Sequence, residues 1–339
     1  MFIRYVPPAL LPMWPDSFRG GPNVLLRSAL FAGIASRKRR FIGIQTSPEK
    51  EPEGVLLASP EGQSIKFAGT QLNQYDADVF FELLHRSRRT ALGSEALFTG
   101  ASFLGAIGRS RNNLNYEDLD DSLRRLKRGT LDVAWRIGPK PYVYTGSLIA
   151  NFTRQTEDKL YRVSLDPDVS TLFADACWTQ IEWDQRLELK GKPLAQWLHS
   201  YYSTHAKPFP VTAAFLKEKT GSPTKQLKHF KVELRAAFEA VSHITGWTVE
   251  WSGDLVKVSR PPTGSQARHL ERADRRRKAI AAAKAPLALP SAVPSASRRT
   301  VAPSRRFPNL SMTSTEPLQG LQSAGTLVDL LLDPSRRGS

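Results

Sequence analysis

The sequence predicts a mixed α+β fold in which one structural unit occurs twice in tandem. Three observations predict it. Apolar residues recur at helical spacing in two separate groups of helices, short alternating stretches follow each group, and glycine or proline separates the elements. The later copy, at residues 190–258, has the clearer pattern, and the earlier copy, between residues 55 and 165, is more diverged.

The later copy is expected to begin with an amphipathic helix at residues 192–205, where apolar residues recur at three- and four-residue steps. Residues 208–211 hold too many prolines for a helix and are predicted to form a short edge strand. A second helix at residues 213–219 ends at Gly221. A long third helix is predicted to start at Ser222, with a buried stripe of leucine and phenylalanine.

A strand pair is predicted to follow the third helix. Gly246 stops the helix, residues 247–251 alternate, residues 252–254 turn, and residues 255–258 return. The order helix, strand, helix, turn, helix and hairpin is that of the winged helix-turn-helix, whose last helix enters the major groove of DNA. The later copy is therefore expected to bind DNA.

The earlier copy repeats this order after two short strands at residues 55–58 and 64–68. Asn73, with Asp76 three residues later, is expected to cap a helix at residues 75–87. The remaining predicted elements are a helix at residues 101–107 closed by Gly108, a helix capped by Asn115, paired strands at residues 130–137 and 142–152, and a third strand at residues 161–165. The sequence thus predicts two winged-helix domains in tandem.

Four segments follow from these elements. Residues 1–53 are expected to form an extended, disordered N-terminal arm, and residues 54–166 and 167–260 the two winged-helix domains. Residues 261–339 are a basic tail rich in Ala, Pro, Ser and Arg, a composition that buries too little apolar surface to offset its ordering entropy. Within this disordered tail, residues 267–284 are predicted to form a basic helix.

The charge of the chain favours a polyanionic partner. The formal net charge is +16 over 339 residues, and each neutralised phosphate releases counterions, although this alone does not choose between DNA, RNA and anionic lipid. Cys177 is the only cysteine, so a disulfide framework and a cysteine-based zinc site are excluded, and a reducing cytoplasm fits. No apolar run approaches the ~20 residues of a membrane helix, and no signal peptide is expected. No cofactor is expected.

In the later copy, the candidate DNA contacts lie on the third helix, away from its apolar stripe. Lysines hold phosphates, and a glutamine can pair both the acceptor and the donor of adenine. The candidates are Lys225, Gln226, Lys228, His229, Lys231 and Arg235. A solvated helix face is the alternative interpretation. DNA contact is favoured because the face follows a helix-turn-helix pattern and holds no acidic residue before Glu233.

In the earlier copy, the candidates fall in two groups separated by acidic residues. Arg109, Arg111, Asn112, Asn113 and Tyr116 precede or open the third helix, and Arg124, Arg125 and Arg128 lie near its end. Glu117, Asp118, Asp120 and Asp121 lie between the groups, where they suit the helix dipole but repel phosphate. Contacts are therefore expected in the turn and at the helix C-terminus, and a role in protein contact or dimerisation remains the alternative. Lys140, at a predicted wing tip, is a further candidate, and a plain hairpin loop is an equally good interpretation of its position.

Several stretches resemble the TrfA-type initiators of broad-host-range plasmid replication. They are Trp14-Pro15-Asp16, Arg-Ser-Ala-Leu-Phe at residues 27–31, Phe-Ala-Gly-Thr-Gln-Leu at residues 67–72, Leu172-Phe173-Ala174, and residues 189–205 with Pro208-Phe209-Pro210. The resemblance spans roughly residues 14–245 and does not extend to residues 261–339. The family has a glutamine-led clamp-binding peptide before the Trp-Pro-Asp segment. Here residues 8–12 read Pro-Ala-Leu-Leu-Pro, which leaves a sliding-clamp contact open.

The resemblance implies tandem winged helices that bind double-stranded origin repeats (iterons). It also implies opening of adjacent AT-rich DNA and recruitment of host replication proteins, the host initiator and the replicative helicase. It implies no enzymatic activity. Contact with single-stranded AT-rich DNA and assembly of a homodimer remain open, and no membrane partner is expected.

Two other classes of function fit parts of the sequence. A transcriptional repressor, or a partitioning or structural DNA-binding protein, would have the same winged helices. A nicking enzyme needs tyrosine nucleophiles and metal-binding histidines, and His199, Tyr201, Tyr202 and His205 are of those types. That class also needs a His-hydrophobe-His triplet, which the chain lacks, and Tyr201 and Tyr202 fall on or beside a packing face. No P-loop motif for ATP hydrolysis is present.

Overall fold

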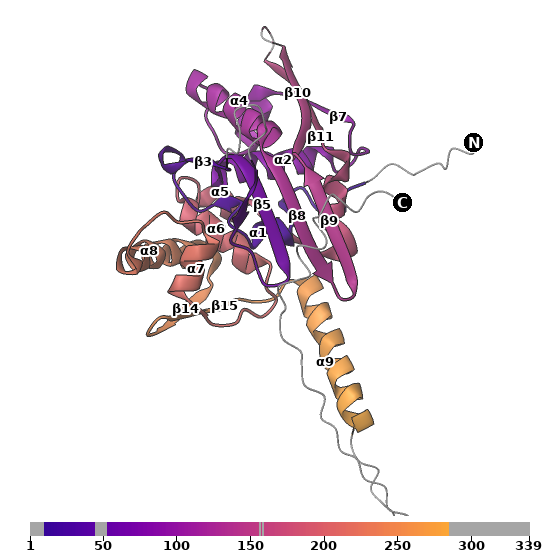
Figure 1. Ribbon diagram of the computed structural model, residues 1–339, viewed down its shortest axis with the longest axis vertical. Coiled ribbons are helices and arrows are strands. Elements are labelled where there is room, and N and C mark those ends of the chain that lie inside the picture. The colour runs from indigo at the N-terminus through magenta and orange to yellow at the C-terminus, as the bar shows by residue number, and fades with distance from the viewer. Residues whose placement is uncertain (1–9, 45–52, 156, 158, 285–339) are drawn as a thin grey trace, which may run out of the picture. The chain divides into compact units, whose positions relative to one another are not determined.

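The same set of three helices and three strands occurs twice in the computed structural model, which describes residues 10–44, 53–155, 157 and 159–284 (Figure 1). In the first winged helix the elements are α2 (Gln74–Ser87), β7 (Glu95–Thr99), α3 (Gly100–Ala106), α4 (Asn113–Arg128), β10 (Ile149–Gln155) and β11 (Leu160–Leu165). In the second they are α6 (Pro193–Ser203), β13 (Val211–Thr212), α7 (Ala213–Lys219), α8 (Leu227–Thr245), β14 (Thr248–Ser252) and β15 (Leu255–Ser259).

The two three-stranded sheets share one topology. In each, the last strand lies in the middle and pairs antiparallel with the strand before it and with the strand between the first two helices. The orders are β10-β11-β7 and β13-β15-β14. This shared topology confirms the predicted tandem winged-helix fold.

Local chemistry also repeats between the copies. The Thr99 hydroxyl accepts from the backbone N–H of Ser102 at 3.2 Å, and the Thr212 hydroxyl accepts from that of Phe215 at 3.1 Å, so a threonine caps each second helix. At the same spacing after each threonine, Gly108 and Gly221 close the second helix with φ of 66° and 64°. Only glycine adopts this left-handed conformation without strain, so the sequence fixes where each turn begins.

The first winged helix carries an inserted hairpin, which the sequence analysis predicted to be part of the wing. β8 (Thr130–Ile137) and β9 (Lys140–Gly146) extend a different sheet, with β3 (Phe41–Ile42), β4 (Val55–Leu57) and β5 (Gln63–Thr70). The predicted strand at residues 142–152 is therefore two strands. The expectation that Lys140 lies at a wing tip is wrong, because the wing is β10–β11.

Residues 10–44 do not form the expected extended arm. β1 (Phe18–Pro22) pairs with β12 (Trp178–Glu182), and β2 (Phe31–Ala32) pairs with β6 (Leu72–Asn73). Between them lie α1 (Asn23–Leu26) and, further on, η1 (Ser36–Lys38). Eleven hydrophobic residues of this segment are buried: Leu11, Trp14, Val24, Leu25, Leu26, Ala29, Leu30, Phe31, Ala32, Ile34 and Ile42. The segment is part of the first core because these short elements bury apolar surface.

Two hydrophobic cores organise the described chain. The first runs from Leu11 to Trp183 and includes η2 (Pro167–Ala176), and the second runs from Leu189 to Val258. The predicted boundary at residues 166 and 167 thus falls inside the first core. The buried side chain of Arg186, on α5 (Trp183–Glu188), joins the cores through Asp78 of α2 at 2.6 Å and Ser200 of α6 at 2.7 Å.

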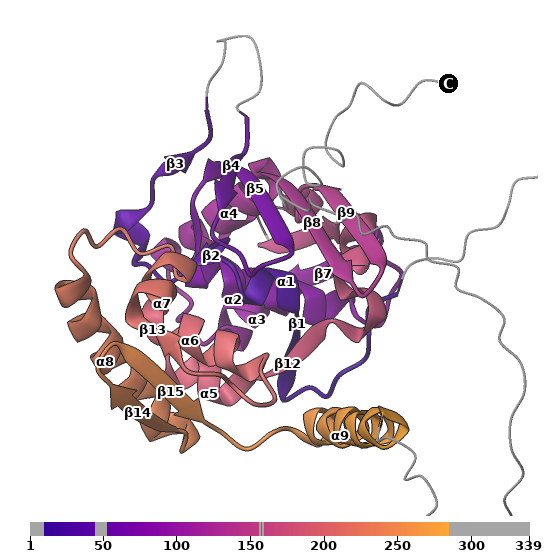
Figure 2. The same ribbon diagram turned by 60° about the horizontal axis from the view of Figure 1, so that its bottom comes forward.

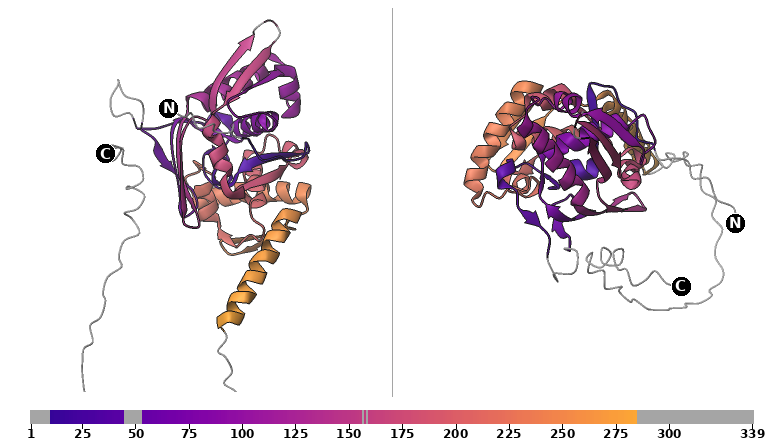
Figure 3. Two further views of the ribbon diagram at one scale, coloured as in Figure 1. Left: turned by 90° about the vertical axis from the view of Figure 1, so that its right-hand side faces the viewer. Right: turned by 90° about the horizontal axis from the view of Figure 1, so that it is seen from above.

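After the second core comes α9 (Gly264–Lys284), where the sequence predicted a basic helix at residues 267–284. In Figures 1 and 3 it extends away from the second winged helix. Within the described ranges, no helix combines the length and apolar character needed to cross a membrane. Residues 1–9, with the start of the peptide at residues 8–12, and the tail from residue 285 onward lie outside the described residues.

Candidate DNA interface

The second winged helix presents the N-terminal end of α8 to solvent, beside hairpin β14–β15 (Figure 2). The helix begins at Leu227, later than predicted, so Lys225 and Gln226 precede it. Phe230, Leu234, Ala237, Phe238 and Val241 are buried as the apolar stripe predicts. Lys228 and His229, in the first helical turn, are exposed. The first turn of α8 and the two residues before it thus form an exposed surface of the second winged helix, and their contact with DNA stays a prediction.

Gln226 occupies the N-cap position of α8 without capping the helix with its side chain. Its amide is exposed at the helix N-terminus, where unsatisfied backbone N–H groups favour anions. The first acidic residue, Glu233, accepts a hydrogen bond from the Thr224 hydroxyl at 3.4 Å. Lys225 and Lys228 therefore flank a positive helix end, which suits a phosphate.

Lys231 and Arg235 hold the wing against α8. The Lys231 ammonium is half-buried and pairs with Asp254 in the turn of the hairpin. The Arg235 guanidinium lies 4.1 Å from the ring centroid of Trp251 on β14. We therefore assign these two predicted contacts a positioning role, since both cations already have partners within the protein.

In the first winged helix, the turn before α4 is fixed by its own side chains. The cap of α4 is Asn112 and not Asn115, because Asn112 Oδ1 accepts from the Asn115 backbone N–H at 2.9 Å. The Asn115 side chain instead donates to the Ser110 carbonyl oxygen at 2.8 Å. Arg111 and Asn113 are exposed beside this cap.

Two other candidates in this turn face protein groups. The Arg109 guanidinium lies 5.0 Å from the ring centroid of Tyr75, and its Nε atom is buried. The Tyr116 ring is half-buried under the Lys159 ammonium, 4.1 Å from its centroid. Lys159 lies directly before β11 of the wing, so this contact joins the wing to the first turn of α4.

The acidic run on α4 is partly neutralised within the protein. The buried Asp120 carboxylate accepts from the Tyr161 hydroxyl at 2.7 Å and pairs with Arg154 of β10. Asp121 pairs with Arg124 at 2.8 Å. The expected repulsion of phosphate is thus weaker than the sequence indicates. Sequence reasoning missed the wing cations Arg154 and Lys159, although the polar stretch before residue 160 marks a turn.

Arg125 serves the fold of the first winged helix. Its guanidinium donates to Asp76 Oδ1 at 2.9 Å and 3.0 Å, and the Ser122 hydroxyl donates to the same oxygen at 2.8 Å. Arg124 and Arg128 remain exposed beside it, around a cavity of about 190 Å³. Of the predicted contacts at the end of α4, Arg124, which pairs with Asp121, and Arg128 are thus the exposed ones.

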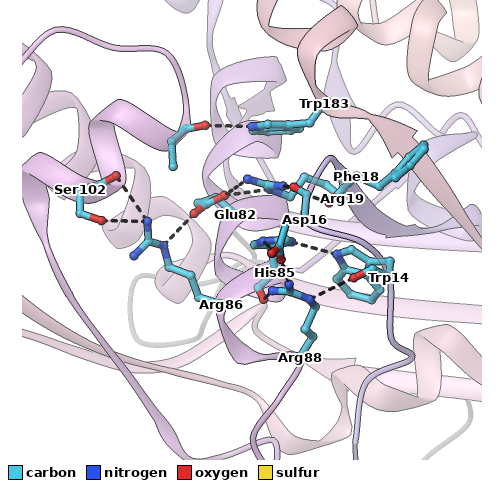
Figure 4. Close-up of polar contacts among 11 residues, drawn as sticks. Trp14, Asp16, Phe18, Arg19, Glu82, His85, Arg86, Arg88, Ser102 and Trp183 are labelled. Carbon is cyan, nitrogen blue, oxygen red and sulfur yellow. Dashed lines mark hydrogen bonds and ion pairs between the residues drawn. The ribbon is translucent and has the colours of Figure 1, made fainter.

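The Trp14-Pro15-Asp16 segment is tied to α2 by a polar network (Figure 4). The Trp14 indole N–H donates to His85 Nδ1 at 3.1 Å, and Asp16 pairs with Arg88. In the same network Glu82 pairs with Arg19 at 2.8 Å and with Arg86 at 2.7 Å. Arg86 also donates to Ser102 of α3 at 3.3 Å, so the network fixes the first helix of the helix-turn-helix.

Of the four residues weighed as parts of a nicking enzyme, His199, Tyr201 and Tyr202 are buried in the second winged helix and His205 is half-buried. Tyr202 and His199 are buried, and Tyr201 stacks on Trp197 with ring centroids 4.8 Å apart. Burial raises the pKa of the Tyr202 hydroxyl. Burial, with the nearby cations Arg186 and Arg260, lowers the pKa of His199 to about 3. The packing interpretation of these tyrosines is confirmed.

The fold and this surface define a protein with two winged helix-turn-helix units in tandem. The family model described as TrfA protein matches residues 9–260, and the chain belongs to this family. The plasmid replication initiator protein TrfA of Escherichia coli is 25% identical over 231 residues, which cover 67% of this chain and 57% of that protein. The chain thus spans little more than half the length of this relative.

Two solved structures are also similar. One is the structure of domains 2 and 3 of RctB, at 13% identity and a TM-score of 0.47, covering 70% of this chain and 97% of that one. The other is the Pi initiator protein in complex with iteron DNA, at 12% identity and a TM-score of 0.41, covering 53% of this chain and 89% of that one.

Proposed function

We propose that this chain is a plasmid replication initiator that binds origin iterons through both winged helices. Membership of the TrfA family is the observation that carries the proposal. The exposed, lysine-flanked N-terminus of α8 supports it, because such a helix end binds DNA phosphates and places side chains at base edges.

The mechanism uses binding energy and no covalent step. Each winged helix places one helix, α4 or α8, in a major groove, and the two grooves lie about one turn, ~10 bp, apart. Several copies on repeated sites bend the DNA and promote opening of the adjacent AT-rich stretch. The bound copies then recruit the host initiator and the replicative helicase. The protein acts on plasmid DNA in the bacterial cytoplasm.

Footprinting on DNA that flanks the gene tests this function. The full chain is expected to protect a series of direct repeats, and permanganate is expected to modify thymines in a neighbouring AT-rich stretch only when protein is bound to a supercoiled template. A single protected inverted repeat, with no permanganate reactivity, would identify a repressor instead. Relaxation of the supercoiled plasmid in Mg²⁺ or Mn²⁺ would show nicking and would contradict the proposal.

A further inference from the structure

Helix α9 is a basic element that follows the end of the family match at residue 260. Six cationic side chains of this helix are exposed: Arg268, Arg272, Arg275, Arg276, Arg277 and Lys278. Glu271 and Asp274 are the acidic residues of the helix, and the pair of Glu271 with Arg275, at 3.7 Å, is itself exposed. A surface pair of this kind holds its cation weakly. The helix therefore presents an excess of positive charge to solvent.

The start of α9 is anchored to the second winged helix. The Arg260 guanidinium donates to the carbonyl oxygen of His205 at 2.8 Å and to Gln266 Oε1 at 3.0 Å, and it lies 5.1 Å from the ring centroid of Trp247. Gln266 Nε2 donates to the Ser203 carbonyl oxygen at 2.8 Å. The basic helix thus leaves the body at a defined point, next to the end of α6.

The N-terminus of α9 is closed by a reciprocal pair of bonds. The Thr263 backbone N–H donates to Gln266 Oε1 at 3.1 Å, and the Gln266 backbone N–H donates to the Thr263 hydroxyl at 3.4 Å. This is the bonding of a capping box, which stabilises a helix start. Gln266 therefore serves both the cap and the anchor, so the direction of the first turn is set by the second winged helix.

The exposed face of α9 suits phosphates in a row. Arg268, Arg272, Arg275 and Arg276 stand at steps of four, three and one, so they share one side of the helix. A helix of 21 residues is about 30 Å long and reaches several phosphates of a duplex. Arginine also pairs with phosphate through two parallel hydrogen bonds.

An anionic membrane fits this helix less well than DNA does. Helices that lie in a membrane interface need a broad apolar face opposite the charged one. In α9 the side chains of Ala267, Leu270 and Ala273 are half-buried and Ile280 is 47% exposed, so the apolar face is narrow. Of these two partners, duplex DNA is therefore the better match for α9.

We propose that α9 is a third DNA-contact element, which binds the phosphates of the duplex flanking the site held by α8. This inference rests on the proposed DNA binding of the winged helices. The contact is independent of base sequence, because arginines on one helix face reach the backbone from outside the grooves. It adds affinity and salt dependence and leaves the choice of site to α4 and α8.

The test compares the full chain with its R272Q/R275Q/R276Q variant on two duplexes. One duplex carries the repeat with long flanks, and the other is trimmed to the repeat. On the flanked duplex the variant is expected to bind about tenfold more weakly at 0.15 M salt, with the slope of log K against log salt reduced by about 2.7, since each phosphate contributes about 0.9. On the trimmed duplex the two proteins should bind equally. Circular dichroism should show unchanged helix content.

The matched control is R89Q/R136Q/K192Q, which removes the same charge from exposed positions on other elements. This control is expected to bind the flanked duplex like the wild type. An equal loss in control and variant would reduce the effect to net charge and overturn the proposal. A variant that binds the flanked duplex with wild-type affinity and salt slope would also overturn the proposal. The same holds if the variant binds DNA normally and loses only its binding to phosphatidylserine vesicles, measured in parallel.

A different result would contradict the proposed function itself. If the wild-type chain shows no preference for the repeat over a scrambled duplex of equal length, iteron binding is contradicted. The contribution of α9 is then still given by the ratio of variant to wild-type affinity on the flanked and trimmed scrambled duplexes.

Discussion

The cations of α8 divide into those with and those without partners in the protein. Lys231 pairs with Asp254 and Arg235 stacks on Trp251, whereas Lys228 is exposed in the first helical turn. Gln226 lies one residue before the helix with its amide unused by the cap. These neighbours should therefore affect DNA binding in different ways, although the sequence gives them the same polar character.

Substitution of Lys228 by alanine should weaken binding to every duplex and reduce the salt slope by about 1, because one phosphate contact is lost. Substitution of Gln226 by alanine should instead relax base preference at one position, by about 1–3 kcal/mol, with the salt slope unchanged. Titrations on the repeat and on single-base variants of it measure both effects. Wild-type affinity and slope in both variants would show that α8 is the wrong helix.

Two histidines of the second winged helix, the buried His199 and the half-buried His205, make the stability of the fold depend on pH. Burial lowers the pKa of His199 to about 3 and that of His205 to about 4, below the ordinary value near 6.5. The unfolded chain therefore binds more protons below pH 6.5. Their stabilising effect is complete above that pH and is lost as the pH falls toward 3.

Substitution of His199 by glutamine should abolish the proton uptake that accompanies unfolding at this position. Between pH 6.5 and 4, the free energy of unfolding of the variant should fall less steeply than that of the wild type, by about 1.4 kcal/mol per pH unit. Urea denaturation across this pH range measures the slope, which is independent of any constant loss of stability in the variant. Parallel curves would mean that His199 titrates normally in the folded protein.

At the scale of elements, each helix-turn-helix is held at matched points by a capping threonine and a left-handed glycine. Thr99 and Gly108 bracket α3, and Thr212 and Gly221 bracket α7. A side chain at Gly221 would also approach Ala32 at 3.2 Å, so the turn packs against the N-terminal segment.

Substitution of Thr212 by alanine should lower the free energy of unfolding by about 1 kcal/mol, because the Phe215 backbone N–H loses its acceptor. Serine at this position retains the hydroxyl and should restore most of the loss. Chemical denaturation of the three proteins measures the effect. An equal decrease in the free energy of unfolding in the alanine and serine variants would indicate that the threonine methyl group, and not the hydroxyl cap, stabilises this helix start.

Helical periodicity predicted the order of the helices in both copies, but the alternation of a strand does not show which strand it pairs with. The β8–β9 hairpin alternates and turns as a wing does, and only its pairing with β5 shows that it belongs to another sheet. The start of α8 was placed too early because Ser222-Pro223 resembles a helix start. In the structure the Ser222 hydroxyl instead accepts from the Thr224 backbone N–H at 3.3 Å, which forms a turn.

The exposed half of the candidate site was predictable, and the paired half was not. Lys225, Gln226 and Lys228 follow from their positions beside an apolar stripe. The partners of Arg125 and Asp120, by contrast, lie far away in sequence, at Asp76 and Arg154. A single sequence holds no record of which distant charges meet, so it could not assign Arg125 to the fold.

At the scale of the whole molecule, the buried joint at Arg186 fixes α2 of the first winged helix to α6 of the second. The guanidinium contacts Asp78, Gln74 and Ser200, and it also faces the ring of Phe81, 5.3 Å from its centroid. Such a joint sets the separation of α4 and α8, the helices proposed to contact DNA, before binding. The entropic cost of fixing the two winged helices relative to each other is then smaller when both bind one duplex.

Substitution of Arg186 by methionine should destabilise the protein by about 3–5 kcal/mol, because it leaves the Asp78 carboxylate buried without its cation. Replacing Asp78 by leucine in the same chain should recover part of this loss, since no charge then remains buried. Urea denaturation of the single and double variants measures the difference. If the D78L substitution instead lowers the free energy of unfolding of the R186M variant further, the two side chains are not coupled and the pairing is contradicted.

The most direct test of the central claim is a hydroxyl-radical footprint of the full chain on one isolated repeat. Two protected patches are expected on one face of the duplex, about one turn (~10 bp) apart, and the K225A/K228A variant should lose only one of them. A single protected patch, or loss of both patches together in the variant, would contradict the claim that each winged helix binds its own groove.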